Sequence, residues 1–213
     1  MRAIQAPQLH PSGLSHEEFI GRVLAVDDVP ITMAVCRVVD ELNAKAPKRL
    51  GVKLACHSGC SACCNQLVCV TLLEWELIRD FLSQADPNRG LRRALDLGVA
   101  EYVRFTDGGR RLPANQLQAV RGLLGRPCIF LVQNRCAVYA VRPLVCRTTS
   151  STIRCRSLQQ EGAAQMRFDY DMWANNLMME TAARAQGRMA VTPLPHLVYI
   201  LLKAQLILLR PNH

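Results

Sequence analysis

Apolar side chains recur at helical spacing in several stretches of the chain, and each stretch is bounded by residues that start or stop a helix. Pro30 precedes one such run, which Pro47 and Gly51 close. Thr71 and Glu74 form the S/T-x-x-E pattern of a capping box ahead of a second run. The same spacing predicts further helices over residues 91–103, 114–124, 169–185 and 194–209. The chain is therefore expected to be mainly helical.

A different pattern begins at Cys128, where the spacing is no longer helical. Two short apolar runs, CIFLV and CAVYAV, are joined by the turn residues QNR. Short apolar runs separated by a turn are typical of a β-hairpin. The expected fold class is mainly α with a small β-hairpin, in which a helical shell surrounds a central cysteine-rich metal-binding region.

The sequence contains no sign of a domain boundary. It has 213 residues, half of them apolar, without an internal repeat, a low-complexity tract or a Gly/Ser linker. This composition excludes an intrinsically disordered chain. A single domain over residues 1–213 is expected, with a metal-binding core at about 54–156 and helical flanks at 1–53 and 157–213.

The compartment bears on the state of the cysteines. The N-terminal residues include no apolar run that could serve as the core of a signal peptide. The longest apolar stretch, residues 194–209, is short for a membrane span and contains His196, Lys203 and Gln205. We therefore expect a cytoplasmic protein with reduced thiols and no membrane segment.

Ten cysteines exceed what packing alone requires, and eight of them form two clusters. The first cluster has the spacing C-x3-C-x2-C-C, in which a tight turn can aim two thiolates at one metal, and Gly59 adds backbone freedom beside it. Cys36 and Cys69 stand alone in apolar surroundings and are expected to be buried. The candidate metal ligands are Cys56, Cys60, Cys63, Cys64, Cys128, Cys136, Cys146 and Cys155.

Positive charge accompanies the cysteines. Two acid-free windows, residues 43–72 and 109–159, carry +13, whereas the rest of the chain carries −4, for a net charge of +9. Cations stabilise thiolates, so Arg142 and Arg147 are expected to bind the cofactor as its neighbours. The same charge leaves open a basic module that binds nucleic acid through its phosphates. Against that alternative, aromatic residues make up only 5% of the chain, and no stacking signature is present.

Two longer elements carry a family resemblance: first CHSGCSACC, then PCIFLVQNRCAVYAVRPLVCR. In this order they resemble the YkgJ-type cysteine-cluster family, described as a zinc- or iron-chelating CxxxCxxCC domain. The resemblance covers residues 54–156 and implies metal ligation by the cysteines of both elements. Cys155 resembles an extension present in some members. The flagellin lysine methylases are similar in the cysteine region, which implies methyl transfer as one possible activity.

An iron–sulfur cluster is expected in preference to zinc, because cysteine is the only plentiful ligand and its spacing is too irregular for two zinc knuckles. Zinc in a structural role is the first alternative. A radical S-adenosylmethionine enzyme is another, since Cys56-x3-Cys60-x2-Cys63 equals the spacing that holds its cluster, although the expected helices do not suit its partial barrel. A disulfide framework is the last alternative. The sequence identifies neither catalytic residues nor a partner.

Overall fold

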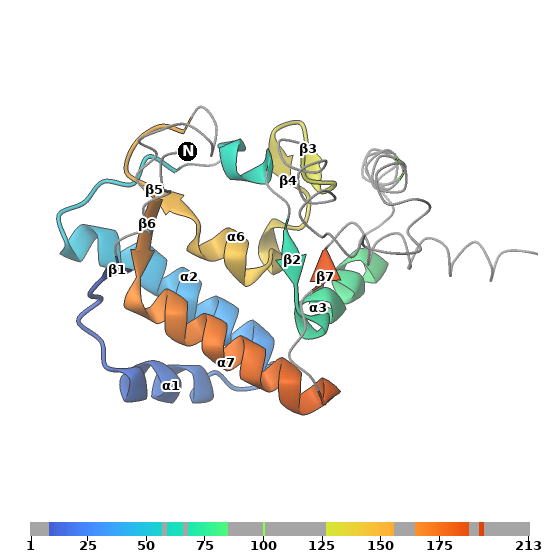
Figure 1. The fold of residues 1–213 in the computed structure, drawn as a ribbon, viewed down its shortest axis with the longest axis horizontal. Helices are drawn as coiled ribbons and strands as arrows, with labels where there is room; N and C mark the ends of the chain where they lie inside the picture. Colours follow the sequence, from blue (N-terminus) through green and yellow to red (C-terminus); the bar gives the residue numbers. More distant parts are fainter. Residues whose placement is uncertain are drawn as a thin grey trace, which may run out of the picture. The chain divides into compact units, whose positions relative to one another are not determined.

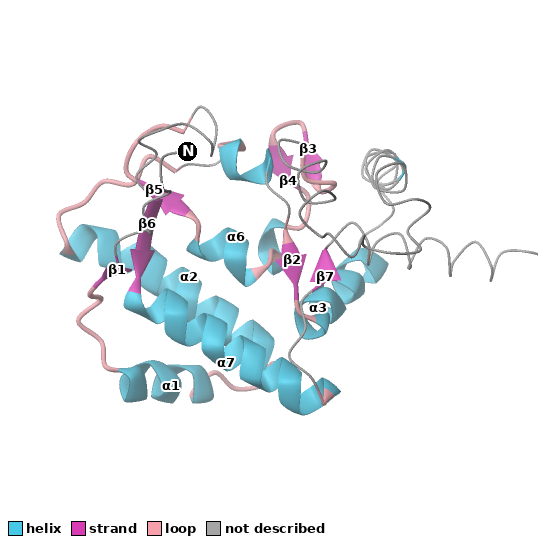
Figure 2. Cartoon of the chain, viewed as in Figure 1, coloured by secondary structure: helices cyan, strands magenta, loops and turns pink. Residues whose placement is uncertain are grey.

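The structure is a computed structural model that describes residues 9–56, 59–65, 68–84, 100, 127–155, 165–187 and 192–193. The chain divides into two compact units, Met1–Cys63 with Val141–Ala190, and Cys64–Ala140 with Val191–His213. Figures 1 and 2 show that helices predominate among the described elements and that the strands are short. The mainly helical fold with a small hairpin is confirmed. A single domain stays a prediction.

Three helices form the frame of the first unit: α1 (His16–Leu24), α2 (Ile31–Arg49) and α7 (Asp169–Gln186). All three contact one another, with α2 and α7 side by side (Figure 1). A capping box starts α1, because Ser15 Oγ accepts the Glu18 N–H at 3.1 Å and the Glu18 carboxylate accepts the Ser15 N–H at 2.7 Å.

The boundaries of α2 and α7 agree with the sequence prediction. α2 begins directly after Pro30, and Pro47 lies in its last turn. α7 ends at Gly187, whose φ of +69° places it in the left-handed region that favours glycine. Local stop signals therefore set the lengths of both helices.

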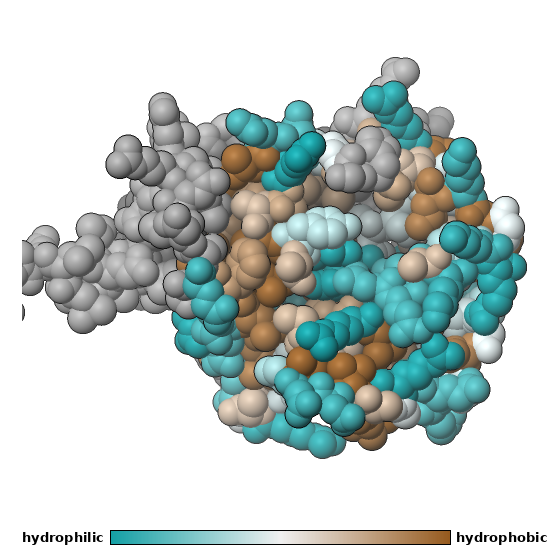
Figure 3. Space-filling view, turned by 180° about the vertical axis from the view of Figure 1, so that it is seen from behind, coloured by the Kyte–Doolittle hydropathy of each residue, from teal (hydrophilic) through white to brown (hydrophobic). Residues whose placement is uncertain are grey.

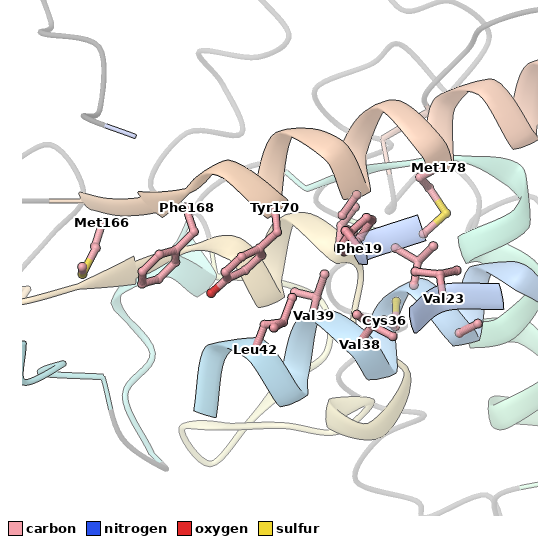
Figure 4. Packing of buried hydrophobic residues seen from close by; sticks show 14 residues of the cluster. Phe19, Val23, Cys36, Val38, Val39, Leu42, Met166, Phe168, Tyr170 and Met178 are labelled. Atoms are coloured by element: carbon pink, nitrogen blue, oxygen red, sulfur yellow. The ribbon is translucent and has the colours of Figure 1, made fainter. Parts of the chain in front are cut away.

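The core of the first unit lies between these helices. Phe19 and Val23 from α1, Val39 from α2 and Tyr170 from α7 are each at most 1% exposed. Figure 4 shows their side chains converging, with the sulfur of Cys36 among them. Burial of apolar side chains of this size contributes about 1.5–3 kcal/mol each. Cys36 is 3% exposed, which confirms the prediction that it is a core residue.

Two carboxylates organise the start of α7. Asp169 accepts the Ser12 N–H on both oxygens, at 3.1 and 3.0 Å, and so ties the N-terminal segment to this helix. Asp171 accepts the Phe168 N–H at 2.8 Å through Oδ2. Its other oxygen is buried and has no hydrogen-bond partner among the residues that the structure describes. Burial is the main reason that the pKa of Asp171 rises to about 7.

A small sheet completes the first unit. It consists of β1 (Leu9–His10), β6 (Gln165–Phe168) and β5 (Ser150–Ser151) in that order, with β1 parallel and β5 antiparallel to β6. The short helix α6 (Leu144–Thr148) comes directly before β5 and contacts α2 and α7. Strands this short leave no alternating pattern, so the sequence did not predict this sheet.

The second unit contains α3 (Leu72–Gln84) and two strand pairs. The first pair, β2 (Cys69–Val70) and β7 (Thr192–Pro193), is antiparallel. α3 begins at the predicted capping box: Thr71 Oγ1 accepts the Glu74 N–H at 3.2 Å, and the Glu74 carboxylate accepts the Thr71 N–H at 2.8 Å. Both residues are buried. The predicted α3 is therefore confirmed.

The second pair is the predicted hairpin, formed by β3 (Leu131–Val132) and β4 (Arg135–Cys136). Gln133 and Asn134 form its turn with φ of 49° and 60°. Two consecutive left-handed residues are typical of the turn that matches the twist of a two-residue hairpin loop. Only two residues on each side pair, so the strands are shorter than the apolar runs.

The prediction for Cys69 is wrong. Cys69 lies on β2 and is exposed. Val68 and Val70, on either side of it in the sequence, are only 5% and 0% exposed. Successive side chains of a strand point to opposite faces, so the two valines take the buried face and Cys69 takes the other. Cys69 therefore does not share the buried surroundings of the apolar residues next to it in the sequence.

Three predicted helices, over residues 91–103, 114–124 and 194–209, lie outside the described residues apart from Ala100. Within the described part of the chain, no helix is both long enough and apolar enough to cross a membrane. Polar side chains lie between the apolar ones on the face seen in Figure 3. Large apolar side chains such as Leu24 and Met172 are exposed, which is ordinary for a protein surface.

The two capping boxes allow a matched test of stability. Ser15→Ala should lower the free energy of unfolding by about 1 kcal/mol, the usual cost of losing a cap. Thr71→Ala should cost more, about 2 kcal/mol, because the hydroxyl also donates to the buried Glu74 carboxylate at 2.9 Å. Urea unfolding followed by circular dichroism measures both. An equal or smaller loss for Thr71→Ala would contradict the role assigned to the buried pair.

Candidate metal centre

All ten cysteines are present as thiols. Among the eight candidate ligands, Cys56 is exposed and the other seven are half-buried. Five belong to the first unit and three to the second. The first group consists of Cys56, Cys60, Cys63, Cys146 and Cys155, and the second of Cys64, Cys128 and Cys136. Each unit therefore combines cysteines from both clusters of the sequence.

Ser151, on β5, links Cys56 to the loop that carries Cys155. The Ser151 N–H donates to Cys56 Sγ at 3.3 Å, and the Ser151 carbonyl accepts the Ala55 N–H at 2.8 Å. The Ser151 hydroxyl donates to the Ile153 carbonyl at 2.8 Å, and the Cys155 thiol donates to the same carbonyl at 3.7 Å. One short strand thus brings the two ends of the cysteine-rich region together.

Three other thiols of the first unit act electrostatically on the thiol of Cys56. The pKa of Cys56 is raised, chiefly because part of its side chain is removed from water although the residue as a whole is exposed, while the hydrogen bond from the Ser151 backbone opposes the rise. The neighbouring thiols of Cys60, Cys155 and Cys63 raise it further. Each of these three thiols therefore lies close enough to Cys56 to affect it electrostatically.

The loop of the first cysteine cluster has the backbone that its sequence requires. Gly59 has a φ of +87°, in the left-handed region, so a side chain there would be strained. A 3-10 helix, Ala62–Asn65, follows and carries both Cys63 and Cys64. The left-handed Gly59 and the tight helical turn after it therefore shape the loop that carries the thiols of this cluster.

The hairpin organises the cysteines of the second unit. The Cys128 N–H donates to the Cys64 carbonyl at 2.6 Å, so the two cysteine segments are joined through their backbones. The Leu131 N–H in turn donates to the Cys128 carbonyl at 2.8 Å. Cys136 lies on β4 opposite Leu131. The predicted positions of Cys128 beside the hairpin and of Cys136 on it are confirmed.

A family model matches residues 55–168, which is more than half of the chain and contains all eight clustered cysteines. The family is CxxCxxCC, described as a "putative zinc- or iron-chelating domain". The chain belongs to this family. The match confirms the cysteine-cluster family expected from the two motifs, and the family description supports metal binding by the cysteines. No curated protein and no solved structure gave a match to the chain.

The CxxCxxCC thiols fit a metal by their chemistry. Cysteine thiolates are the ligands preferred by zinc and by iron–sulfur clusters, and an N–H donor to sulfur, such as that of Ser151, stabilises the thiolate form. Among the described residues, however, no set of three or more histidine, cysteine, aspartate or glutamate side chains is arranged to hold a metal ion as it stands.

The two arginines expected beside a cofactor both bind a carboxylate of α2. Arg142 Nη2 lies 2.8 Å from Asp40 Oδ1, and Arg147 Nη1 binds Asp40 Oδ2. The Arg147 side chain is only 2% exposed. Both arginines thus have a structural partner, while their place beside a metal centre stays a prediction.

Sequence analysis did not single out Ser151 or Asp40 as contributors to the site. Ser151 lies far from Cys56 in sequence, and their contact arises only when β5 comes beside residues 55–56. Asp40 precedes the family-matched segment and forms no motif with the cysteines. Tertiary contacts of this kind leave no local signal in one sequence.

Proposed function

We propose that this CxxCxxCC protein holds an iron–sulfur cluster on the thiolates of Cys56, Cys60, Cys63 and Cys155, with zinc as the alternative metal. The observation that carries the proposal is the position of Ser151, whose N–H lies 3.3 Å from Cys56 Sγ and whose hydroxyl donates to the Ile153 carbonyl that also accepts the Cys155 thiol, so that the two cysteine segments meet. The thiols of Cys60, Cys155 and Cys63 lie near enough to Cys56 to raise its pKa. Cys146, in the same unit, is proposed as a further ligand of this centre, and Cys64, Cys128 and Cys136 are proposed as metal ligands within the second unit.

The chemistry of the donors favours iron and sulfide. The sequence offers ten cysteines but only five histidines, and four thiolates complete the usual ligand set of a [4Fe–4S] or [2Fe–2S] cluster. When bound, such a cluster supplies electron transfer or an electrophilic iron. The Ser151 N–H would stabilise the negative charge on Cys56 sulfur, and hydrogen bonds to sulfur are one way that a protein sets the potential of a cluster.

Anaerobic purification followed by absorption spectroscopy, metal analysis and sulfide analysis tests the proposal. We expect a coloured protein with thiolate-to-iron charge-transfer absorption and with iron and acid-labile sulfide in similar amounts. A colourless protein with stoichiometric zinc and no sulfide would establish the zinc alternative. A protein with no bound metal after supply of either iron and sulfide or zinc would overturn metal binding as well.

The raised pKa of Cys56 predicts that metal binding depends on pH. A thiol whose pKa lies above its ordinary value is protonated at neutral pH, and its proton must leave before sulfur binds a metal. The apparent zinc affinity should therefore increase as pH rises from 6 to 8, with release of protons on binding. Calorimetry in two buffers of different ionisation enthalpy measures this release. Binding without proton release would exclude these thiols as the ligands.

A further inference from the structure

Asp40, on α2, binds both arginines of RPLVCR (residues 142–147), the segment that ends the second cysteine element. One carboxylate oxygen lies 2.8 Å from Arg142 Nη2, and the other binds Arg147 Nη1. The Arg147 guanidinium also donates through Nε to the Arg142 carbonyl at 2.9 Å. A buried guanidinium requires a counter-charge and full hydrogen bonding. Asp40 therefore fixes both arginines that flank Cys146.

A second contact from the same face of α2 holds this element. Asn43 lies three residues after Asp40, which places both side chains on one side of the helix. Asn43 Nδ2 donates to the Arg147 carbonyl at 3.0 Å, and Asn43 Oδ1 accepts the Tyr170 hydroxyl at 2.8 Å. Arg147 is thus held to α2 through both its side chain and its backbone.

The element held by α2 leads directly into the thiol cluster. α6 carries Cys146 and ends at Thr148, and β5 begins two residues later. Within β5, Ser151 binds the sulfur of Cys56. The Thr149 hydroxyl donates to the Val145 carbonyl at 2.6 Å, which stiffens the connection between α6 and β5. A change in the position of α6 would therefore be transmitted to the thiols.

We propose that Asp40 is a positioning residue for the thiolate site, acting from outside the family-matched segment by fixing the element that carries Cys146. α2 ends at Arg49, before the match begins at residue 55. The N-terminal flank thus supplies the counter-charge for a motif that lies in the matched segment. This inference rests on the proposed function, because it requires that Cys146 binds the metal.

Cobalt(II) is the probe for the test, because its thiolate charge-transfer absorption reports both the affinity and the number of bound sulfurs, whichever metal is native. Loss of a residue that orients a metal ligand typically weakens affinity 10- to 100-fold. Asp40→Asn should therefore bind cobalt roughly tenfold more weakly or worse, with a smaller charge-transfer band. Asp40→Glu, which keeps the charge, should restore much of both.

Glu41 offers a matched control on the same helix. Its carboxylate lies 2.6 Å from Lys45 Nζ and 3.8 Å from Arg22 Nη1, and it is about half exposed. Glu41→Gln makes the same change of charge next to Asp40, and it should leave the cobalt spectrum unchanged. Should Asp40→Asn fail to fold, Asn43→Ala leaves Asp40 in place and removes the donor to the Arg147 carbonyl together with the acceptor of the Tyr170 hydroxyl. It should weaken cobalt binding in the same direction.

A double-variant cycle separates positioning from a general loss of stability. If Asp40 acts through Cys146, adding Asp40→Asn to Cys146→Ala should weaken cobalt binding no further. Fully additive losses, or a normal spectrum in folded Asp40→Asn and Asn43→Ala, would overturn the inference. So would a Cys146→Ala variant that binds cobalt as the wild type does. Each of these results leaves standing a metal centre on Cys56, Cys60, Cys63 and Cys155, whereas a wild-type protein that binds no thiophilic metal would overturn the proposed function itself.

Discussion

Replacing Cys56 and Cys155 together by serine should reduce the bound metal at least tenfold while leaving the protein folded. Serine is nearly the same size as cysteine, but its hydroxyl is a poor ligand for zinc or for the iron of a cluster. Cys56 is exposed and Cys155 is half-buried, and neither belongs to the hydrophobic core, so their replacement leaves the core intact. Metal analysis of the purified variant, with circular dichroism to confirm folding, measures the effect.

Cys69→Ser is the matched control for this experiment. Cys69 is also exposed, but it lies on β2 and outside both cysteine clusters. This variant should retain the metal content of the wild type. Full metal occupancy in the Cys56→Ser and Cys155→Ser double variant would remove these two residues from the ligand set, whereas equal losses in the double variant and in Cys69→Ser would indicate an unspecific effect.

The second large effect expected is a dependence of stability on pH that originates at Asp171. This carboxyl is 5% exposed, and its pKa is raised to about 7, mainly by burial and also by Asp169, while the Phe168 N–H and Arg167 oppose the rise. The folded state therefore keeps a proton that the unfolded chain loses near its ordinary pKa of 3.8. The free energy of unfolding should decrease as pH rises from about 4 to 7, by about 4 kcal/mol from this group.

Asp171→Asn should abolish this contribution, because an amide does not ionise. Urea unfolding of the wild type and the variant at several pH values between 4 and 8 measures the difference between the two profiles. Asp171→Ala should give the same flatter profile at a lower overall stability, because it also loses the hydrogen bond to the Phe168 N–H. Parallel profiles of wild type and both variants would contradict a raised pKa at Asp171.

Local signals explain which parts of the fold could be predicted from the sequence. Apolar spacing with nearby start and stop residues predicted α2, α3 and α7, because each of these signals lies within a few residues of the helix that it starts or ends. The hairpin followed from a turn between two apolar runs. The Ser15 and Glu18 pattern before α1 was an equally local signal, identical in kind to that of Thr71, and could have predicted that helix.

Contacts between distant residues explain what could not be predicted. β1 pairs with β6 across most of the chain, and strands of two residues carry no periodicity. The wrong prediction for Cys69 had a usable signal, because Cys69 alternates with Val70 in β2 and with Val68 directly before it. The candidate ligands themselves followed from cysteine spacing, whereas the contact of Ser151 with Cys56 depends on the tertiary fold.

X-ray absorption at the edge of the bound metal tests the central claim most directly, because it reports the atoms that surround the metal. The account predicts a first shell made only of sulfur at about 2.3 Å, with iron neighbours beyond it if the centre is an iron–sulfur cluster. A first shell of nitrogen or oxygen at about 2.0–2.1 Å would contradict a centre held by cysteine thiolates.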